Sequence, residues 1–228
     1  MTHRKPRKIS SVRSGRGAVR WGMLTTAGLT TLATAGTAHA SGGIPHDVGV
    51  AVDQARTIAT RVHPVSYQES FTVHQFGALV SATADNRAVA TSIACRADDP
   101  CRSIALSFQI VTTAGTNMRL HASNVGKATN VHCPECETFA GAYQFVVSTP
   151  GVLTLDSGTR HQLDLLSSQA YALGHSNRSV ADIKQRADAL AAQVVSLLRG
   201  AVAAAPRTQA VDPLQQFQPT VTMHRYVS

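Results

Sequence analysis

Several motifs of enzyme active sites and phosphate-binding sites are absent from this chain, and their absence narrows the range of functions that the sequence suggests. The sequence contains no H-E-x-x-H zinc motif, no G-x-S-x-G nucleophile motif and no glycine-rich phosphate-binding loop. None of the histidines beyond the first forty residues stands at metal-ligand spacing from a carboxylate; they are His46, His63, His74, His121, His132, His161, His175 and His224. The sequence therefore nominates no catalytic residue, no cofactor and no metal ligand, and it leaves open whether the protein is an enzyme.

Acidic residues are absent from the first forty positions, which carry seven Lys and Arg residues. A weakly apolar stretch follows this basic region, and an Ala-His-Ala cleavage site ends at Ala40. The segment has no Arg-Arg pair, which favours the general secretory pathway, and no Cys at the cleavage point, which argues against a lipoprotein anchor. We expect residues 1–40 to be a signal peptide and the mature, secreted or extracellular chain to begin at Ser41. An uncleaved signal anchor is the alternative, although the apolar run is shorter than the ~20 residues of a membrane span.

Removal of the signal peptide changes the charge balance. The whole chain has 21 Lys and Arg against 13 Asp and Glu, a net charge of +8. Subtracting the seven basic residues of segment 1–40 leaves 14 basic against 13 acidic residues, a net charge of +1. Nucleic-acid binding thereby loses its only support, which was a basic footprint, and we expect no nucleic-acid partner. The remaining ~188 residues fit one domain with a hydrophobic core, and no second apolar run of membrane-spanning length is expected.

The four cysteines lie in a sequence repeat. The first copy, residues 86–111, reads N-R-A-V-A-T-S-I-A-C, a loop, then C-R-S-I-A-L-S-F-Q-I-V. The second copy, residues 124–146, reads N-V-G-K-A-T-N-V-H-C, a shorter loop, then C-E-T-F-A-G-A-Y-Q-F-V. The asparagine precedes the first Cys by nine residues in both copies, and both continue as C-x3-A-x2-[FY]-Q-[IF]-V. Repetition at fixed register predicts one supersecondary unit that is used twice and stacked.

Alternation of bulky with small or polar residues predicts strands within each copy. The bulky positions are Ile104, Leu106, Phe108 and Ile110 in the first copy and Phe139, Tyr143 and Phe145 in the second. We interpret each copy as a β-hairpin with the cysteines at its tip, and the two hairpins as a four-stranded antiparallel sheet. One or two further strands are expected in residues 67–80.

Helices are predicted on both sides of the repeats. Apolar residues from Val48 to Val62 recur at helical spacing after Asp47, a good N-cap, so we expect an N-terminal helix there. A helical hairpin is expected over residues 157–200, because two amphipathic patterns are separated by Gly174 and a capping signature at Ser179. Residues 201–228 are rich in Ala, Pro and Gln and are expected to form a flexible tail.

Four cysteines in an exported chain indicate two disulfides, for which three pairings are possible. Local pairing, Cys95–Cys101 and Cys133–Cys136, fits the repeat best, and pairing across the repeats remains an alternative. The Cys133-Pro-Glu-Cys136 spacing also allows a thiol redox site, but strand patterns flank it where redox chemistry wants a helix N-terminus. A four-cysteine zinc site is a further alternative, to which His132 could add a ligand.

Gln109 and Gln144 occupy equivalent positions on the small-residue face of their strands. They are either a pair of ligand-binding amides or structural amides that bond the backbone and one another. Small neighbouring alanines, which permit close packing, favour the structural interpretation.

The second copy resembles a domain found in secreted or surface proteins of actinobacteria. It is also similar to the extracellular region that follows the membrane part of some peptide zinc metalloprotease-like proteins. The resemblance covers about residues 84–198 and is carried by Asn124, Ala128, Asn130, Cys133, Cys136, Ala140, Tyr143 and Gln144. Gly126 replaces the usual Ala, and the first copy has Ser92 in place of Asn130 and a longer cysteine loop. Since the protease part is absent, the resemblance implies an exported location and this architecture, and no reaction.

Together these observations predict an α+β domain over residues 41–200, with a repeat-built antiparallel sheet, a C-terminal helical hairpin and an N-terminal helix. We expect an exported, non-enzymatic module whose partner is an unidentified protein or the cell envelope. A thiol redox or metal-dependent activity at Cys133 and Cys136 is the alternative.

Overall fold

The computed structural model describes residues 48–115, 118–205 and 219–228. The expected signal peptide lies outside the described residues. The elements are β1 (Val48–Thr60), β2 (Val65–Ala78), β3 (Ser81–Ile93), β4 (Arg102–Ala114), β5 (Arg119–Val131), β6 (Glu137–Thr149), α1 (Ser157–Gly174), α2 (Val180–Ala204) and β7 (Thr220–Val227).

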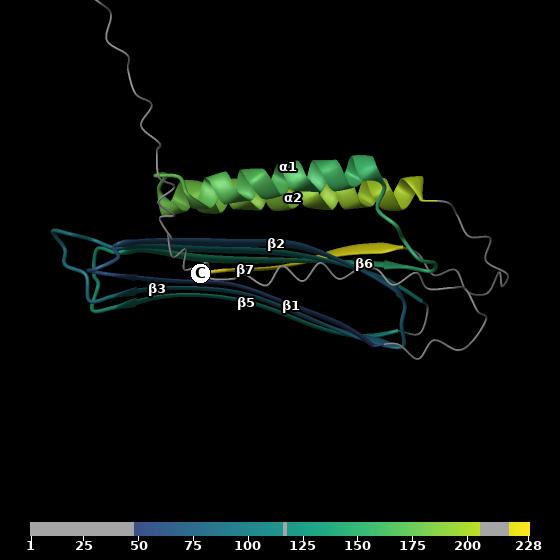
Figure 1. Cartoon of the computed structure of the whole chain (residues 1–228), viewed down its shortest axis with the longest axis horizontal. Helices are drawn as coiled ribbons and strands as arrows, with labels where there is room; N and C mark the ends of the chain where they lie inside the picture. The colour runs from purple at the N-terminus through teal and green to yellow at the C-terminus, as the bar shows by residue number, and fades with distance from the viewer. Residues whose placement is uncertain (1–47, 116–117, 206–218) are drawn as a thin grey trace, which may run out of the picture. The chain divides into compact units, whose positions relative to one another are not determined.

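The first six strands alternate between two sheets. Sheet A has the strand order β1-β3-β5 and sheet B the order β2-β4-β6-β7, and within each sheet the first three strands run parallel. The chain therefore passes from sheet A to sheet B three times and returns twice, and each coil adds one strand to each sheet (Figure 1). Such a stack of coils, each contacting its neighbours, is a two-sheet β-solenoid.

The register of the sheets places equivalent repeat residues side by side. Asn86 pairs with Asn124 in sheet A, and Phe108 pairs with Tyr143 in sheet B. The same ladders continue into β1 and β2, where Asp53 aligns with Asn86 and Phe71 aligns with Phe108. The fold thus holds a third coil, formed by β1 and β2, that has no cysteines and that the sequence repeat alone did not show.

The predicted antiparallel hairpins are wrong. The two strands of one repeat do not pair with each other; they lie in different sheets, and the cysteine loop is an arc that joins the sheets. Alternation of bulky and small residues is the same in parallel and antiparallel strands, so the pattern could not separate the two arrangements. Only β6 and β7 form an antiparallel pair among the described strands.

The predicted N-terminal helix is also wrong, because residues 48–60 form strand β1. Its burial alternates strictly, with Ala51, Ala55 and Ala59 inside and Val50 and Val52 outside. Alanine fits a helix face and a strand face equally well, so the spacing of apolar residues over 48–60 is compatible with both a helix and a strand. The β-branched residues on the outer face favour a strand. The single strand β2, in contrast, is where one or two strands were expected.

Small side chains separate the two sheets. The space between them is filled by buried alanines, Ala55, Ala88, Ala90, Ala105, Ala140 and Ala142. The large side chains lie on the other face of sheet B, where Phe108, Tyr143 and Phe145 are fully buried against α1 and α2 (Figure 1). The main hydrophobic core therefore lies between sheet B and the helices.

The predicted helical hairpin is present. The side chain of Asp156 caps α1, and Ser179 caps α2 by accepting a hydrogen bond from the backbone of Asp182, as the capping signature indicated. Helix α2 continues to Ala204, four residues beyond the end of the helical hairpin expected over residues 157–200. By length and composition alone α2 could cross a membrane, although six of its side chains are buried in the fold.

The predicted flexible tail contains an ordered strand. Strand β7 pairs with β6 and adds a fourth strand to sheet B, whereas residues 206–218 lie outside the described part of the chain. Gly126 on β5 makes room for β7, because a Cβ atom there would lie 2.7 Å from the backbone oxygen of Tyr226. The replacement of Ala by Gly in the second copy therefore has a structural reason.

Candidate functional site

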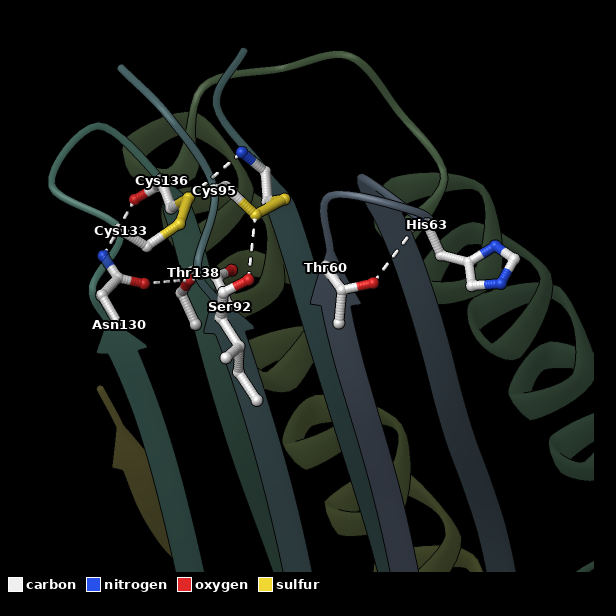
Figure 2. The surroundings of a disulfide bond; sticks show 10 residues. Thr60, His63, Ser92, Cys95, Asn130, Cys133, Cys136 and Thr138 are labelled. Carbon is white, nitrogen blue, oxygen red and sulfur yellow. Dashed lines mark hydrogen bonds between the residues drawn. A yellow bond between two sulfur atoms is a disulfide. The ribbon is translucent and has the colours of Figure 1, made fainter.

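The four cysteines come together where two neighbouring arcs stack. The structure contains the disulfides Cys95–Cys101 and Cys133–Cys136, the local pairs that the repeat favoured. All four sulfur atoms lie within 4.8 Å of one another (Figure 2). Cys95, Cys101 and Cys133 are buried, and Cys136 is half-buried. The two disulfides thus form one sulfur cluster on the side of the solenoid where the second and third coils pass from sheet A to sheet B.

Equivalent residues shape the two arcs. Ala94 and His132, which precede the first cysteine of each pair, both have positive φ values, 56° and 51°. The backbone N–H of Ala94 donates to the carbonyl of Val131 (2.9 Å), and the N–H of Cys101 donates to the sulfur of Cys136 (3.1 Å). The left-handed backbone at these two residues turns both arcs out of sheet A at equivalent positions. The role of His132 is therefore the backbone conformation that it adopts in the arc, and its side chain is not part of the sulfur cluster.

A short polar chain lies beneath the sulfur cluster. Ser92 and Thr138 join their hydroxyl groups at 2.7 Å, and Thr138 donates to the side-chain oxygen of Asn130. The Asn130 amide in turn donates to the carbonyl of Cys136 at 3.0 Å (Figure 2). Ser92 and Asn130 occupy one of the positions at which the two copies differ, and one hydrogen-bonded network accommodates both residues.

Ladders of amide side chains join the two sheets. Gln144 donates to the side-chain oxygen of Gln109 and to the carbonyl of Ala84, both at 2.8 Å. Asn86 likewise donates to Asn124 at 2.9 Å and accepts from Ser107 at 2.6 Å. These amides are bonded to one another and to the backbone, which is the structural interpretation of Gln109 and Gln144.

A histidine–carboxylate pair ends the glutamine ladder at the first coil. Asp53 accepts hydrogen bonds from Gln109 at 2.6 Å and contacts Nε2 of His74 at 2.8 Å. Burial alone would raise the pKa of Asp53, but the hydrogen bonds from His74 and Gln109 outweigh it and hold this pKa below its ordinary value. The pair could not be found from the sequence, because Asp53 lies on β1 and His74 lies on β2.

A second carboxylate has no such support. Burial raises the pKa of Glu69 on β2 to about 7. One of its oxygens is buried without a hydrogen-bond partner among the described residues. Glu69 aligns with Leu106, which belongs to the core between sheet B and the helices. This carboxylate is therefore a source of pH-dependent stability.

The outer face of sheet A is exposed. Within the described residues no element packs on it, and its side chains include Val50 and Val52, with 62% and 65% of their surface exposed. A shallow depression on this face is lined by Gln54, Arg56, Arg87, Val89, Thr91, Lys127 and Thr129. Three of these residues are cations, and none of the three forms an ion pair with another described residue.

The sequence did not reveal this face, because residues 48–60 were predicted as a helix. The signal that could have found it is the Val-x-Val-x-Val alternation of residues 48–52, which is typical of a strand. With β1 placed as a strand in register with β3, Arg56 and Arg87 fall on the same side as Lys127.

Comparison with known proteins adds no relative. No family model, no curated protein and no solved structure matches this chain.

Proposed function

We propose that the protein is an exported, non-enzymatic module that binds the cell envelope through the outer face of sheet A. The exposure of that face carries the proposal. The outer face of sheet B is covered by α1 and α2. Sheet A, in contrast, has one face without cover among the described residues. Exposed valines beside unpaired cations are typical of an interaction surface.

Export is supported by two sequence features and one structural one. The basic segment and the Ala-His-Ala site are those of a signal peptide, and disulfides persist mainly outside the cytoplasm. The resemblance to secreted actinobacterial domains points the same way. Local disulfides and amide ladders keep the face rigid, so little conformational entropy would be lost when a ligand binds.

The proposal is tested by co-sedimentation with envelopes isolated from the cells that express the protein. Thr91 lines the depression from β3, the middle strand of sheet A, and Thr91→Trp would block the surface while keeping a residue type that strands favour. Ser196→Trp, on the exposed side of α2, is the matched control. We expect the control to sediment like the natural protein and Thr91→Trp to stay in solution. Equal sedimentation of the two variants, or none by the natural protein, would overturn the proposal.

A second candidate function is favoured by the closeness of the four sulfur atoms. A tetrahedral Zn²⁺ with sulfur ligands at ~2.3 Å holds those sulfurs ~3.8 Å apart, and in this protein all four lie within 4.8 Å. Reduction of both disulfides by an external dithiol would take up four electrons and four protons. The four thiols would then bind one Zn²⁺ and release four protons.

Thiol titration and zinc analysis of the purified protein decide on this second candidate. About four titratable thiols per chain with bound zinc would support it. Absence of free thiols and of zinc would leave the sulfur cluster a structural role alone.

A further inference from the structure

Three cations on the outer face of sheet A form a group that we call the cationic triangle: Arg56 on β1, Arg87 on β3 and Lys127 on β5. In the sheet register, Arg56 and Lys127 flank Val89, and Arg87 lies two residues before Val89 on the same strand. With strands ~4.8 Å apart and same-face neighbours ~6.7 Å apart, the three Cα atoms lie about 8–10 Å from one another. Long basic side chains can reach a common point over such a triangle.

The charge of the triangle is not neutralised within the described residues. All three side chains are exposed, and none makes an ion pair. The residues that line the depression between them are Gln54, Val89, Thr91 and Thr129, which carry no charge. The nearest acid on the same face is Asp85, which precedes Arg87 by two residues on β3. This surface therefore complements an anion.

The lining also indicates what kind of anion fits. No aromatic side chain lines the depression, so stacking on sugar rings or bases does not contribute. Two guanidinium groups and one ammonium group approach from three corners, and arginine binds phosphate through paired N–H donors. The phosphorus of a phosphodiester carries four oxygens in a tetrahedron, two of them charged, whereas a planar carboxylate offers two oxygens in one plane.

We infer that the cationic triangle of Arg56, Arg87 and Lys127 binds phosphate groups of a linear phosphodiester polymer in the cell envelope. This inference rests on the proposed function and names the ligand class for the same face. A polymer is favoured over a small molecule because the depression is shallow, and each exposed ion pair contributes little. Successive phosphates along one chain rebind at high local concentration.

The test measures binding of a glycerol phosphate oligomer, of polygalacturonate as a carboxylate polymer, and of inorganic phosphate. The variant Arg56→Gln/Arg87→Gln/Lys127→Gln is compared with Arg61→Gln/Arg160→Gln/Arg199→Gln, which removes three exposed cations away from the triangle. We expect the first variant to bind the glycerol phosphate oligomer about tenfold more weakly or worse. The control should bind within about twofold of the natural protein, and added salt should weaken both the natural protein and the control.

The outcomes separate this inference from the proposed function. Natural protein that sediments with envelopes but binds the oligomer no better than polygalacturonate would overturn the phosphate assignment and leave the proposed function standing. Equal losses in both triple variants would show nonspecific charge attraction and would also overturn it. Natural protein that binds neither envelopes nor the oligomer would overturn both. Binding of inorganic phosphate as tightly as the oligomer would contradict the polymer as ligand.

Discussion

At the scale of single residues, buried polar groups of the coils fall into those that have hydrogen-bond partners and those that lack them. Amides at equivalent positions bond to each other across the coils, as Gln109 and Gln144 do, and Asp53 ends that ladder with two hydrogen-bond donors. Glu69 has a buried oxygen without a partner among the described residues. Unpartnered buried polar atoms are costly, so Glu69 is a place where pH acts on stability.

We predict that Glu69→Gln removes a loss of stability that the natural protein suffers as pH rises. The folded pKa, about 7, is raised above the ordinary value of 4.5, so the folded state binds the proton more tightly. The contribution of Glu69 is therefore fully favourable below about pH 4.5 and is lost as pH rises through about 7. Glutamine imitates the protonated form. The melting temperature of Glu69→Gln should exceed that of the natural protein at pH 8 and should match it at pH 4.5.

Glu135→Gln is the control for this measurement, because it removes the same charge from an exposed arc residue. Its melting temperature should follow that of the natural protein at both pH values. A Glu69→Gln variant that is equally stable, relative to the natural protein, at pH 8 and pH 4.5 would contradict the assignment.

At the scale of elements, stacked aromatic rings hold sheet B against the helices. The rings of Phe71, Phe108 and Tyr143 follow one another up the three coils, with centroids 5.6 Å and 4.7 Å apart. Tyr143 also donates its hydroxyl to Asp188 on α2 at 2.9 Å. Parallel in-register pairing explains this stack, because it repeats one side-chain position from coil to coil.

We predict that Phe108→Ala and Tyr143→Ala each lower the free energy of unfolding by about 3–5 kcal/mol, through lost burial and a cavity. Both side chains are fully buried. Lys127→Ala, on the exposed face of β5, should change it by no more than about 0.5 kcal/mol. Urea midpoints of the three variants measure the difference. Aromatic variants that unfold at the same urea concentration as Lys127→Ala would show that this face is not the core.

The elements also show which parts of the fold could be predicted from the sequence. The helices carry capping residues at Asp156 and Ser179 and wide apolar stripes, which have no good alternative interpretation. Strands β4 and β6 carry bulky residues at period two. How these strands pair was not predictable, since a repeat fits a stack of hairpins and a stack of coils equally well. The cationic triangle depends on that pairing, so it could not be found before the register was known.

At the scale of the whole molecule, the two ends of the solenoid differ from each other. Strand β7 covers the β6 edge of sheet B, whereas β1 and β2 are edge strands among the described residues. Sulfur-linked arcs stand on the second and third coils, and the arc of the first coil, residues 61–64, has no cysteine. The molecule therefore combines a repeated centre with unlike ends, as solenoid proteins commonly do.

For the intact protein we predict processing after Ala40. Protein recovered from the culture medium should begin at or near Ser41, and Ala40→Arg should prevent its release, since cleavage needs a small residue at that position. N-terminal sequencing of the released protein measures the first, and fractionation of the variant measures the second. Full-length natural protein held in membranes would instead identify an uncleaved signal anchor.

Successive residues along the strands of sheet A face opposite sides, and this alternation bears on how the protein can evolve. Every second residue of β1, β3 and β5 belongs to the alanine and amide interior, and the residues between them belong to the outer face. The two sets are interleaved in one sequence, yet they act on separate properties. Substitutions in one set alter what the surface attracts, while the other set keeps the coils in register. Recognition and architecture can therefore diverge independently within the same thirteen-residue strands.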